Sequence, residues 1–148
     1  KRMSREHFGK ILRDVTHAGI YHAPPQGMAD LLAAAESAGY AVYRVGLGRT
    51  KDKEDLLDRI ALVLEFPDWF GRNWDALQDC LTDLSWQPAE GHVVILDECD
   101  AFRIDHSEDF TTMLQVFGSA ADYWREEHIP FWTLVDMHAD GIAYLPGL

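Results

Sequence analysis

The sequence has few of the features that mark secreted or membrane proteins. It contains only two cysteines, Cys80 and Cys99, which are too few for a disulfide framework and do not form a C-x-x-C pair. No apolar run is long enough to cross a bilayer, and the basic residues at the start are not followed by the apolar segment of a secretory signal. These absences favour a reducing compartment, and we expect the protein to be cytoplasmic.

Positive charge is also scarce. The 148 residues include 13 Lys and Arg against 25 Asp and Glu, which gives a net charge of -12. Nucleic acids and anionic membranes require a cationic surface on the protein, so this charge argues against both as ligands. A cationic protein is the partner that such a charge permits, although many acidic proteins owe their charge to solubility alone.

The motifs of common enzymes are missing. The stretch GLGR at 46–49 lacks the spacing of a nucleotide-binding loop, and no H-E-x-x-H motif occurs. We therefore expect no cofactor, no metal and no catalytic residue. One enzymatic alternative remains, a metal-dependent hydrolase, because Asp97, Glu98 and Asp136 follow apolar strands at whose ends active sites often lie. Carboxylates at such places are more often helix caps or solvated groups.

Hydrophobic periodicity predicts an α/β fold. Helical spacing of apolar residues occurs at 28–37, 53–64, 74–84 and 107–126, and apolar strand-like runs occur at 40–47, 92–96 and 131–136. Apolar strands that alternate with helices indicate a parallel sheet covered by helices. We predict a single domain over residues 1–148 with a small parallel sheet of three strands, to which 19–23 is a candidate fourth.

Residues 65–86 combine a loop that carries two aromatic side chains with an acidic helix. Asn73 is a favourable N-cap for this helix. At about 100° per residue, apolar and acidic side chains fall on opposite sides. The apolar side holds Trp74, Leu77, Leu81 and Leu84, and the acidic side holds Asp75, Asp79 and Asp83.

The acidic stripe has two interpretations. Carboxylates four residues apart repel by about 0.2–0.5 kcal/mol per pair, and the positive helix N-terminus compensates mainly for Asp75. A solvated helix face is the simpler interpretation. The preceding Trp69 and Phe70 favour a binding surface, because only one of two adjacent aromatic side chains turns inward easily, and an exposed Trp beside carboxylates is typical of an interface hot spot.

The segment from Pro67 to Thr82 resembles a known family. Its pattern P-D-W-F-G-x-N-W-D-A-L-x-D-C-L-T is similar in order and spacing to the signature loop and helix of barstar, the intracellular inhibitor of barnase-type ribonucleases. Weaker similarity extends over about 40–136, which leaves 1–39 as an N-terminal extension. The resemblance implies a barstar-like fold and a ribonuclease inhibitor that blocks the nuclease active site with residues 67–83.

The resemblance also implies individual roles. Asp79 would take the place of the RNA phosphate and pair with the catalytic Arg and His of the nuclease. Asp75 would pair with a neighbouring cation, and Trp69 would stack over the catalytic histidine. Asn73 and Gly71 would contribute polar and backbone contacts.

Three departures from the family limit what is known of the target. Gln78 stands where the family has an aromatic residue, Ser119 stands where it has an acidic contact, and the loop after Leu84 is longer and offers Trp86 as a candidate extra contact. The residues predicted to bind the partner are Trp69, Phe70, Gly71, Asn73, Trp74, Asp75, Gln78, Asp79, Thr82, Asp83 and Trp86.

On the basis of this resemblance, we expect the protein to be an immunity protein that neutralises a basic ribonuclease, of extracellular or toxin type, in a 1:1 complex. The main alternative is an acidic interaction or immunity module for a cationic toxin that is not a ribonuclease. Every sequence feature named above is shared by the two hypotheses.

Overall fold

The protein folds as an α/β structure, which confirms the predicted class. The structure, a computed structural model, describes residues 4–147. The helices and strands follow one another as α1 (Arg5–Arg13), β1 (Ile20–His22), α2 (Met28–Ser37), β2 (Ala41–Gly46), α3 (Lys53–Leu64), α4 (Trp74–Leu81), β3 (His92–Asp97), α5 (Asp100–Asp105), α6 (Ser107–Glu126) and β4 (Phe131–Val135), with a short 3-10 turn at Val15–His17.

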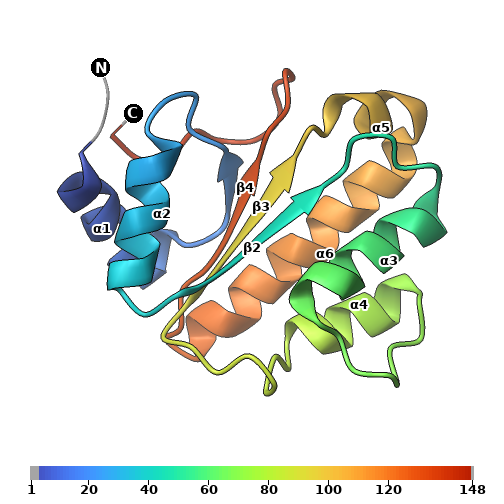
Figure 1. Ribbon diagram of the computed structural model, residues 1–148, viewed down its shortest axis with the longest axis horizontal. Coiled ribbons are helices and arrows are strands. Elements are labelled where there is room, and N and C mark those ends of the chain that lie inside the picture. The colour runs from blue at the N-terminus through green and yellow to red at the C-terminus, as the bar shows by residue number, and fades with distance from the viewer. Residues whose placement is uncertain (1–3, 148) are drawn as a thin grey trace.

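Four parallel strands form the sheet, in the order β1-β4-β3-β2 (Figure 1). The three predicted strands are present, and the candidate at 19–23 is a fourth. It forms β1, which pairs with β4 so that Ile20 lies opposite Thr133. Strands β3 and β4 are buried from His92 to Leu96 and from Phe131 to Val135, as expected for parallel strands with helices on both faces.

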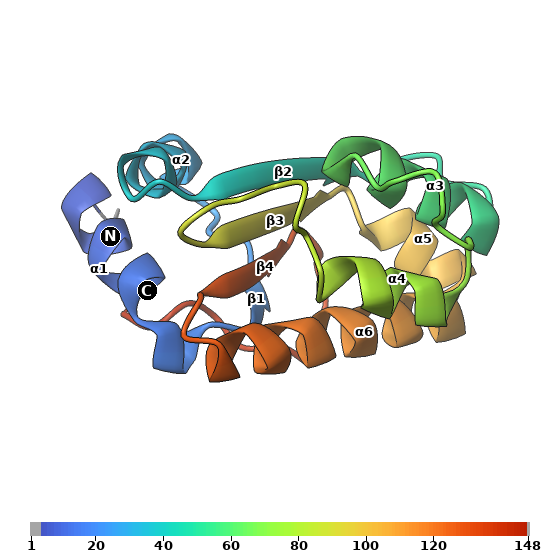
Figure 2. The ribbon, with the colours of Figure 1, turned by 90° about the horizontal axis from the view of Figure 1, so that it is seen from below.

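The helices α3, α4, α5 and α6 cover one face of the sheet (Figure 2). The largest buried cluster lies between them and the strands. Phe117 of α6 packs near Phe131 of β4, with ring centroids 6.4 Å apart. Leu56, Leu57, Ile60 and Leu64 give α3 its buried side, and α6 contributes Phe110, Met113, Phe117, Ala120 and Ala121.

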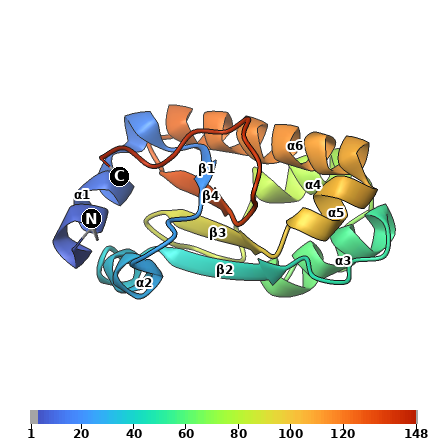
Figure 3. The same cartoon turned by 90° about the horizontal axis from the view of Figure 1, so that it is seen from above.

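The helices α1 and α2 cover the opposite face (Figure 3). Trp132 of β4 is fully buried there, and its indole N–H donates to the carbonyl of Leu12 at 3.0 Å. The tail after β4 returns past β1, where the amide of His22 donates to the carbonyl of Ala143 at 2.8 Å. Residues 4–39 therefore supply an edge strand and much of the cover of the second face.

Helix boundaries agree with the sequence patterns at 28–37, 53–64 and 107–126, but differ at three places. Helix α4 ends at Leu81 instead of near Leu84, and α1 and α5 were not predicted. Helix α5 is only six residues long, too short to show periodicity. No helix in residues 4–147 has the length and apolar character needed to span a membrane.

His92, the first residue of β3, is a buried ionisable group. Its side chain is 3% exposed, and its Nδ1 lies 2.9 Å from the hydroxyl of Tyr43. The rings of Trp124 and Phe131 lie within about 6 Å of it. Burial lowers the pKa of His92 from its ordinary value of 6.5 to about 4. The imidazole is therefore neutral in the folded protein at neutral pH.

We expect His92 to destabilise the fold in mild acid. In the unfolded protein the imidazole binds a proton near pH 6.5, but in the folded protein it does so only near pH 4. The contribution of neutral His92 to the free energy of unfolding is therefore complete above pH 6.5 and declines as the pH falls towards 4. The decline is on the order of 3 kcal/mol. His92→Gln keeps a hydrogen-bond partner for Tyr43 and should flatten this part of the curve of unfolding free energy against pH.

Urea unfolding between pH 7.5 and 4 measures the effect. The exposed His7 serves as the matched position, and His7→Gln should retain the parent slope. Identical slopes for His92→Gln and the parent protein would contradict the assignment.

Candidate functional site

Helix α4 presents its acidic side to solvent because its apolar side packs into the core. The side-chain oxygen of Asn73 accepts the amide of Ala76 at 2.7 Å, so Asn73 is the N-cap that the sequence predicts. Leu77 and Leu81 are fully buried in the main core cluster. The spacing of the helix then leaves Asp75 and Asp79 exposed.

The end of α4 is fixed by two hydrogen bonds. The indole N–H of Trp124 on α6 donates to the carbonyl of Leu81 at 2.7 Å, and the hydroxyl of Thr82 donates to the carbonyl of Gln78 at 2.8 Å. Because these groups satisfy terminal carbonyls, the helix ends before Asp83. The predicted stripe is corrected accordingly: Asp83 lies in the following turn, where its carboxylate accepts the amide of Ser85 at 3.3 Å.

Residues 65–73, between α3 and α4, form the aromatic loop. Phe70 is half-buried and packs against the core, whereas Trp69 is 59% exposed. This confirms that only one of the two adjacent aromatics turns inward. Gly71 lies close to the helix start, where an added Cβ would sit 3.5 Å from the Cβ of Ala76. Trp69 is therefore presented to solvent in the loop that leads into α4.

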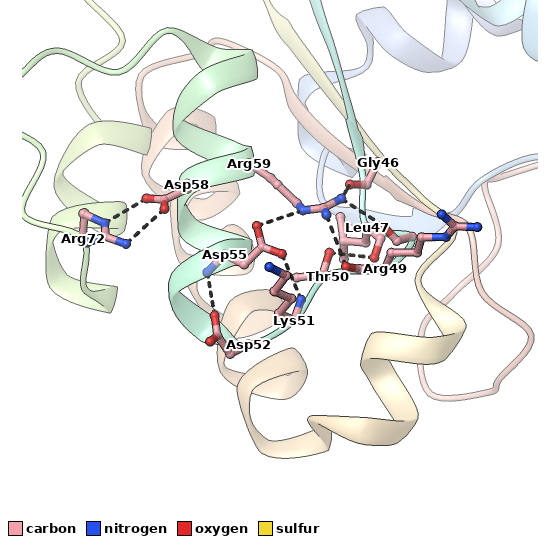
Figure 4. A network of polar contacts seen from close by, with 11 residues as sticks. Gly46, Leu47, Arg49, Thr50, Lys51, Asp52, Asp55, Asp58, Arg59 and Arg72 are labelled. Atoms are coloured by element: carbon pink, nitrogen blue, oxygen red, sulfur yellow. Dashed lines mark hydrogen bonds and ion pairs between the residues drawn. The ribbon is translucent and has the colours of Figure 1, made fainter.

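Arg72 is a residue of this site that the sequence analysis missed. It has a left-handed backbone (φ 53°), and its guanidinium donates to both carboxylate oxygens of Asp58 on α3, at 2.8 and 3.0 Å (Figure 4). The pairing raises the pKa of Arg72. The bidentate pair ties the aromatic loop to α3. Since the partners are 14 positions apart, no local motif predicts it.

Arg59 on α3 forms a second set of contacts in Figure 4. Its guanidinium donates to the carbonyls of Gly46, Gly48 and Arg49 and to the carboxylate of Asp55. These bonds hold the connection between β2 and α3 in place. Helix α3 is thus fixed at its start, and through Asp58 it supports the aromatic loop.

Two of the three carboxylates of the alternative enzymatic site, those of Asp97 and Asp136, have structural partners. Asp97 accepts two hydrogen bonds of 3.0 Å from Arg44, and Asp136 accepts the amide of Glu98 at 3.0 Å. Within residues 4–147 no group of three or more His, Cys, Asp and Glu is arranged to hold a metal ion. The geometry therefore gives no support to a metal-dependent hydrolase.

Comparison with known families identifies the family of the chain. Residues 40–136 match the family model described as barstar, the barnase inhibitor. The chain belongs to the barstar family. This confirms the resemblance seen in the segment from Pro67 to Thr82, and it makes the protein a member of a family of inhibitors that bind ribonucleases, not of enzymes.

Comparisons with individual proteins add little. A search of curated proteins gave no match. Among solved structures, the ORC2 protein of Aeropyrum pernix, solved in ADPNP-ADP complexes, aligns with 20% identity and a TM-score of 0.45. The alignment covers 88% of this chain and 46% of that one, so the chain spans about half the length of the ORC2 protein. A likeness this distant carries no argument about function.

The residues predicted to bind the partner lie on one continuous stretch of the barstar-family chain, from the aromatic loop to the turn after α4. Those classed as exposed are Trp69, Gly71, Asn73, Asp75, Asp79 and Asp83. Those partly buried are Phe70, Trp74, Gln78, Thr82 and Trp86. Ser119, which stands in place of a family acid, is also exposed, on α6.

We expect Asp79 to contribute nothing favourable to folding. Its side chain makes no hydrogen bond or ion pair with the described residues, and it lies four positions from both Asp75 and Asp83. Asp79→Asn should raise the unfolding free energy by about 0.2–0.5 kcal/mol, or the melting temperature by about 1–2 °C. Thermal melts at low ionic strength measure this.

Asp75 is the matched control for that measurement. It lies in the first turn of α4, where the helix dipole favours a carboxylate, so Asp75→Asn should not raise the melting temperature. A large drop in melting temperature for Asp79→Asn would show instead that Asp79 has a structural role.

Proposed function

We propose that this protein inhibits a ribonuclease by inserting α4 and the aromatic loop into the nuclease active site. The observation that carries the proposal is Asp79, an exposed carboxylate with no side-chain partner in the described residues, in the last turn of the outward face of α4. It belongs to a barstar-family chain, and the exposed Trp69 lies in the loop that leads into the same helix. A carboxylate left unpaired in the free protein is available to a cationic pocket.

The proposed mechanism requires no chemistry from the inhibitor. Asp79 would occupy the position of an RNA phosphate and accept charge-assisted hydrogen bonds from the Arg and His that cleave RNA. Asp75 would meet a neighbouring cation, and the indole of Trp69 would cover the pocket and exclude water. Excluding water strengthens each of these electrostatic contacts, because the local dielectric falls.

The partner that this surface fits is a basic ribonuclease, of extracellular or toxin type, bound in a 1:1 complex. The net charge of -12 favours a cationic partner over long distances as well as at contact. We propose that the inhibitor acts in the cytoplasm, as an immunity protein that protects its cell from the nuclease.

A second candidate follows from the departures from the family pattern. Gln78 and Ser119 replace an aromatic and an acidic contact at the predicted surface. If the target differs from ribonucleases, the same acidic face would serve as an immunity module for another cationic toxin. Inhibition of RNA cleavage distinguishes the two candidates.

The first functional prediction compares two aspartates. Asp79→Ala should weaken inhibition of barnase by about 2–5 kcal/mol, because a buried cationic pocket is left unpaired. Asp83→Ala should have a much smaller effect, since Asp83 lies in the turn beyond the helix and already accepts the amide of Ser85. The barnase–barstar complex is itself one of the systems behind this range of energies.

Inhibition constants from cleavage of a fluorogenic RNA by barnase provide the measurement. Asp83→Ala is the matched control, because it removes the same charge from the same surface. Equal losses for the two variants would contradict the central role of Asp79, and no inhibition by micromolar parent protein would contradict the proposed function.

The second functional prediction concerns ionic strength. Association between a protein of net charge -12 and a basic nuclease is steered over roughly the Debye length, which is ~30 Å at 0.01 M and ~8 Å at 0.15 M salt. Raising salt across this range should slow association about tenfold or more while changing dissociation little. Stopped-flow measurement of association with barnase tests this, and a rate independent of salt would refute electrostatic steering.

A further inference from the structure

Trp86, predicted as a contact with the partner, also has partners within the protein. It lies after α4 and is partly buried against the main core cluster. Its indole N–H donates to the carbonyl of Leu64, the last residue of α3, at 3.0 Å. Its polar atom is therefore used within the protein, where it satisfies a carbonyl that a helix end leaves unpaired.

The ring of Trp86 is held by further contacts. Phe66 meets it nearly edge-on, with centroids 6.1 Å apart and planes at 85°. The neighbouring Gln87 donates to the carbonyl of Leu64 at 3.4 Å and to the carboxylate of Glu65 at 3.2 Å. The turn after α4 is thereby tied to the start of the aromatic loop, and Trp86 is a fixed part of the structure.

Trp69 depends on this fixed ring. Among the described residues, its only aromatic contact is with Trp86, at 6.2 Å between centroids and 86° between planes. This distance and angle are those of a favourable edge-to-face pair. The rest of the Trp69 side chain is largely exposed, at 59%. Without Trp86, the indole of Trp69 would have little to hold it in one orientation.

We propose that Trp86 is a positioning residue that holds Trp69 ready to stack on the partner. Holding the indole in place before binding removes part of the entropy cost of ordering it in the complex. The face of Trp69 that Trp86 leaves open would receive a flat cationic or imidazole side chain of the ribonuclease. The effect on affinity rests on the proposed function, but the effect on the motion of Trp69 does not.

A double-mutant cycle tests the effect on affinity. Trp86→Ala should weaken inhibition of barnase about 2- to 12-fold, the range expected for an edge-to-face pair. In a Trp69→Ala background, Trp86→Ala should change the inhibition constant by less than about twofold. A change of this size is within the usual error of additivity between independent sites. Trp86→Phe keeps an aromatic ring beside Trp69 and should restore most of the inhibition. Equal losses in both backgrounds would overturn the proposal, since Trp86 would then act without Trp69.

Loss of stability is controlled with two further variants. Trp132→Phe removes an indole hydrogen bond to the carbonyl of Leu12 on the opposite face of the sheet, and it should leave inhibition unchanged. If Trp86→Ala does not fold, Trp86→Leu preserves apolar packing but offers no ring to Trp69. Trp86→Leu should then behave as described for Trp86→Ala, and parent-like inhibition by it would overturn the proposal.

A measurement without any partner separates this inference from the proposed function. The indole ¹⁵N–¹H heteronuclear NOE of Trp69 reports its fast motion. It should fall in Trp86→Ala, or in Trp86→Leu if Trp86→Ala does not fold, and stay at the parent value in Trp132→Phe. An unchanged value in the Trp86 variant would overturn the positioning role, even if the parent protein inhibits barnase. A lower value would support it, even if barnase proves not to be inhibited.

Discussion

The buried centre of the sheet is the constraint on which the rest of the structure depends. Every residue from His92 to Leu96 in β3, and all of β4, is buried. Strands of this kind need apolar cover on both faces, because each alternate side chain points to the opposite side. The helices α3 to α6 provide that cover on one face, and α1 and α2 provide it on the other.

The candidate site is a consequence of this cover. Helix α4 is held by its buried Leu77 and Leu81 and by the hydrogen bond from Trp124, so its outward face need not contribute to folding. Folding therefore does not require the side chains of Asp75 and Asp79, which remain available for binding. Their presence costs a mild mutual repulsion. Residues outside the aromatic loop hold it in a similar way: Asp58 pairs with Arg72, and Trp86 packs against Trp69.

Much of this architecture could be predicted from local pattern. The boundaries at 53–64 and 107–126 follow from helical periodicity over more than ten residues, and the N-cap at Asn73 follows from its side-chain chemistry. The signature between Pro67 and Thr82 also identified the family. Contacts between distant segments could not be predicted. The pairing of Arg72 with Asp58, the inward turn of the Trp86 indole and the end of α4 at Leu81 all depend on residues brought together only by the fold.

The pairing of β1 with β4 also bears on how the chain reaches its native state. The indole of Trp132 bonds to the carbonyl of Leu12, a residue 120 positions away, and β1 is completed on one side by β4 and on the other by Ala143. Contacts of such large sequence separation form late and slow the search for the native topology. Until they form, β4 has an unpaired edge and an uncovered apolar face, the features that promote intermolecular strand pairing. Residues 4–39 therefore cover the edge and the apolar face of β4 only once the native topology has formed.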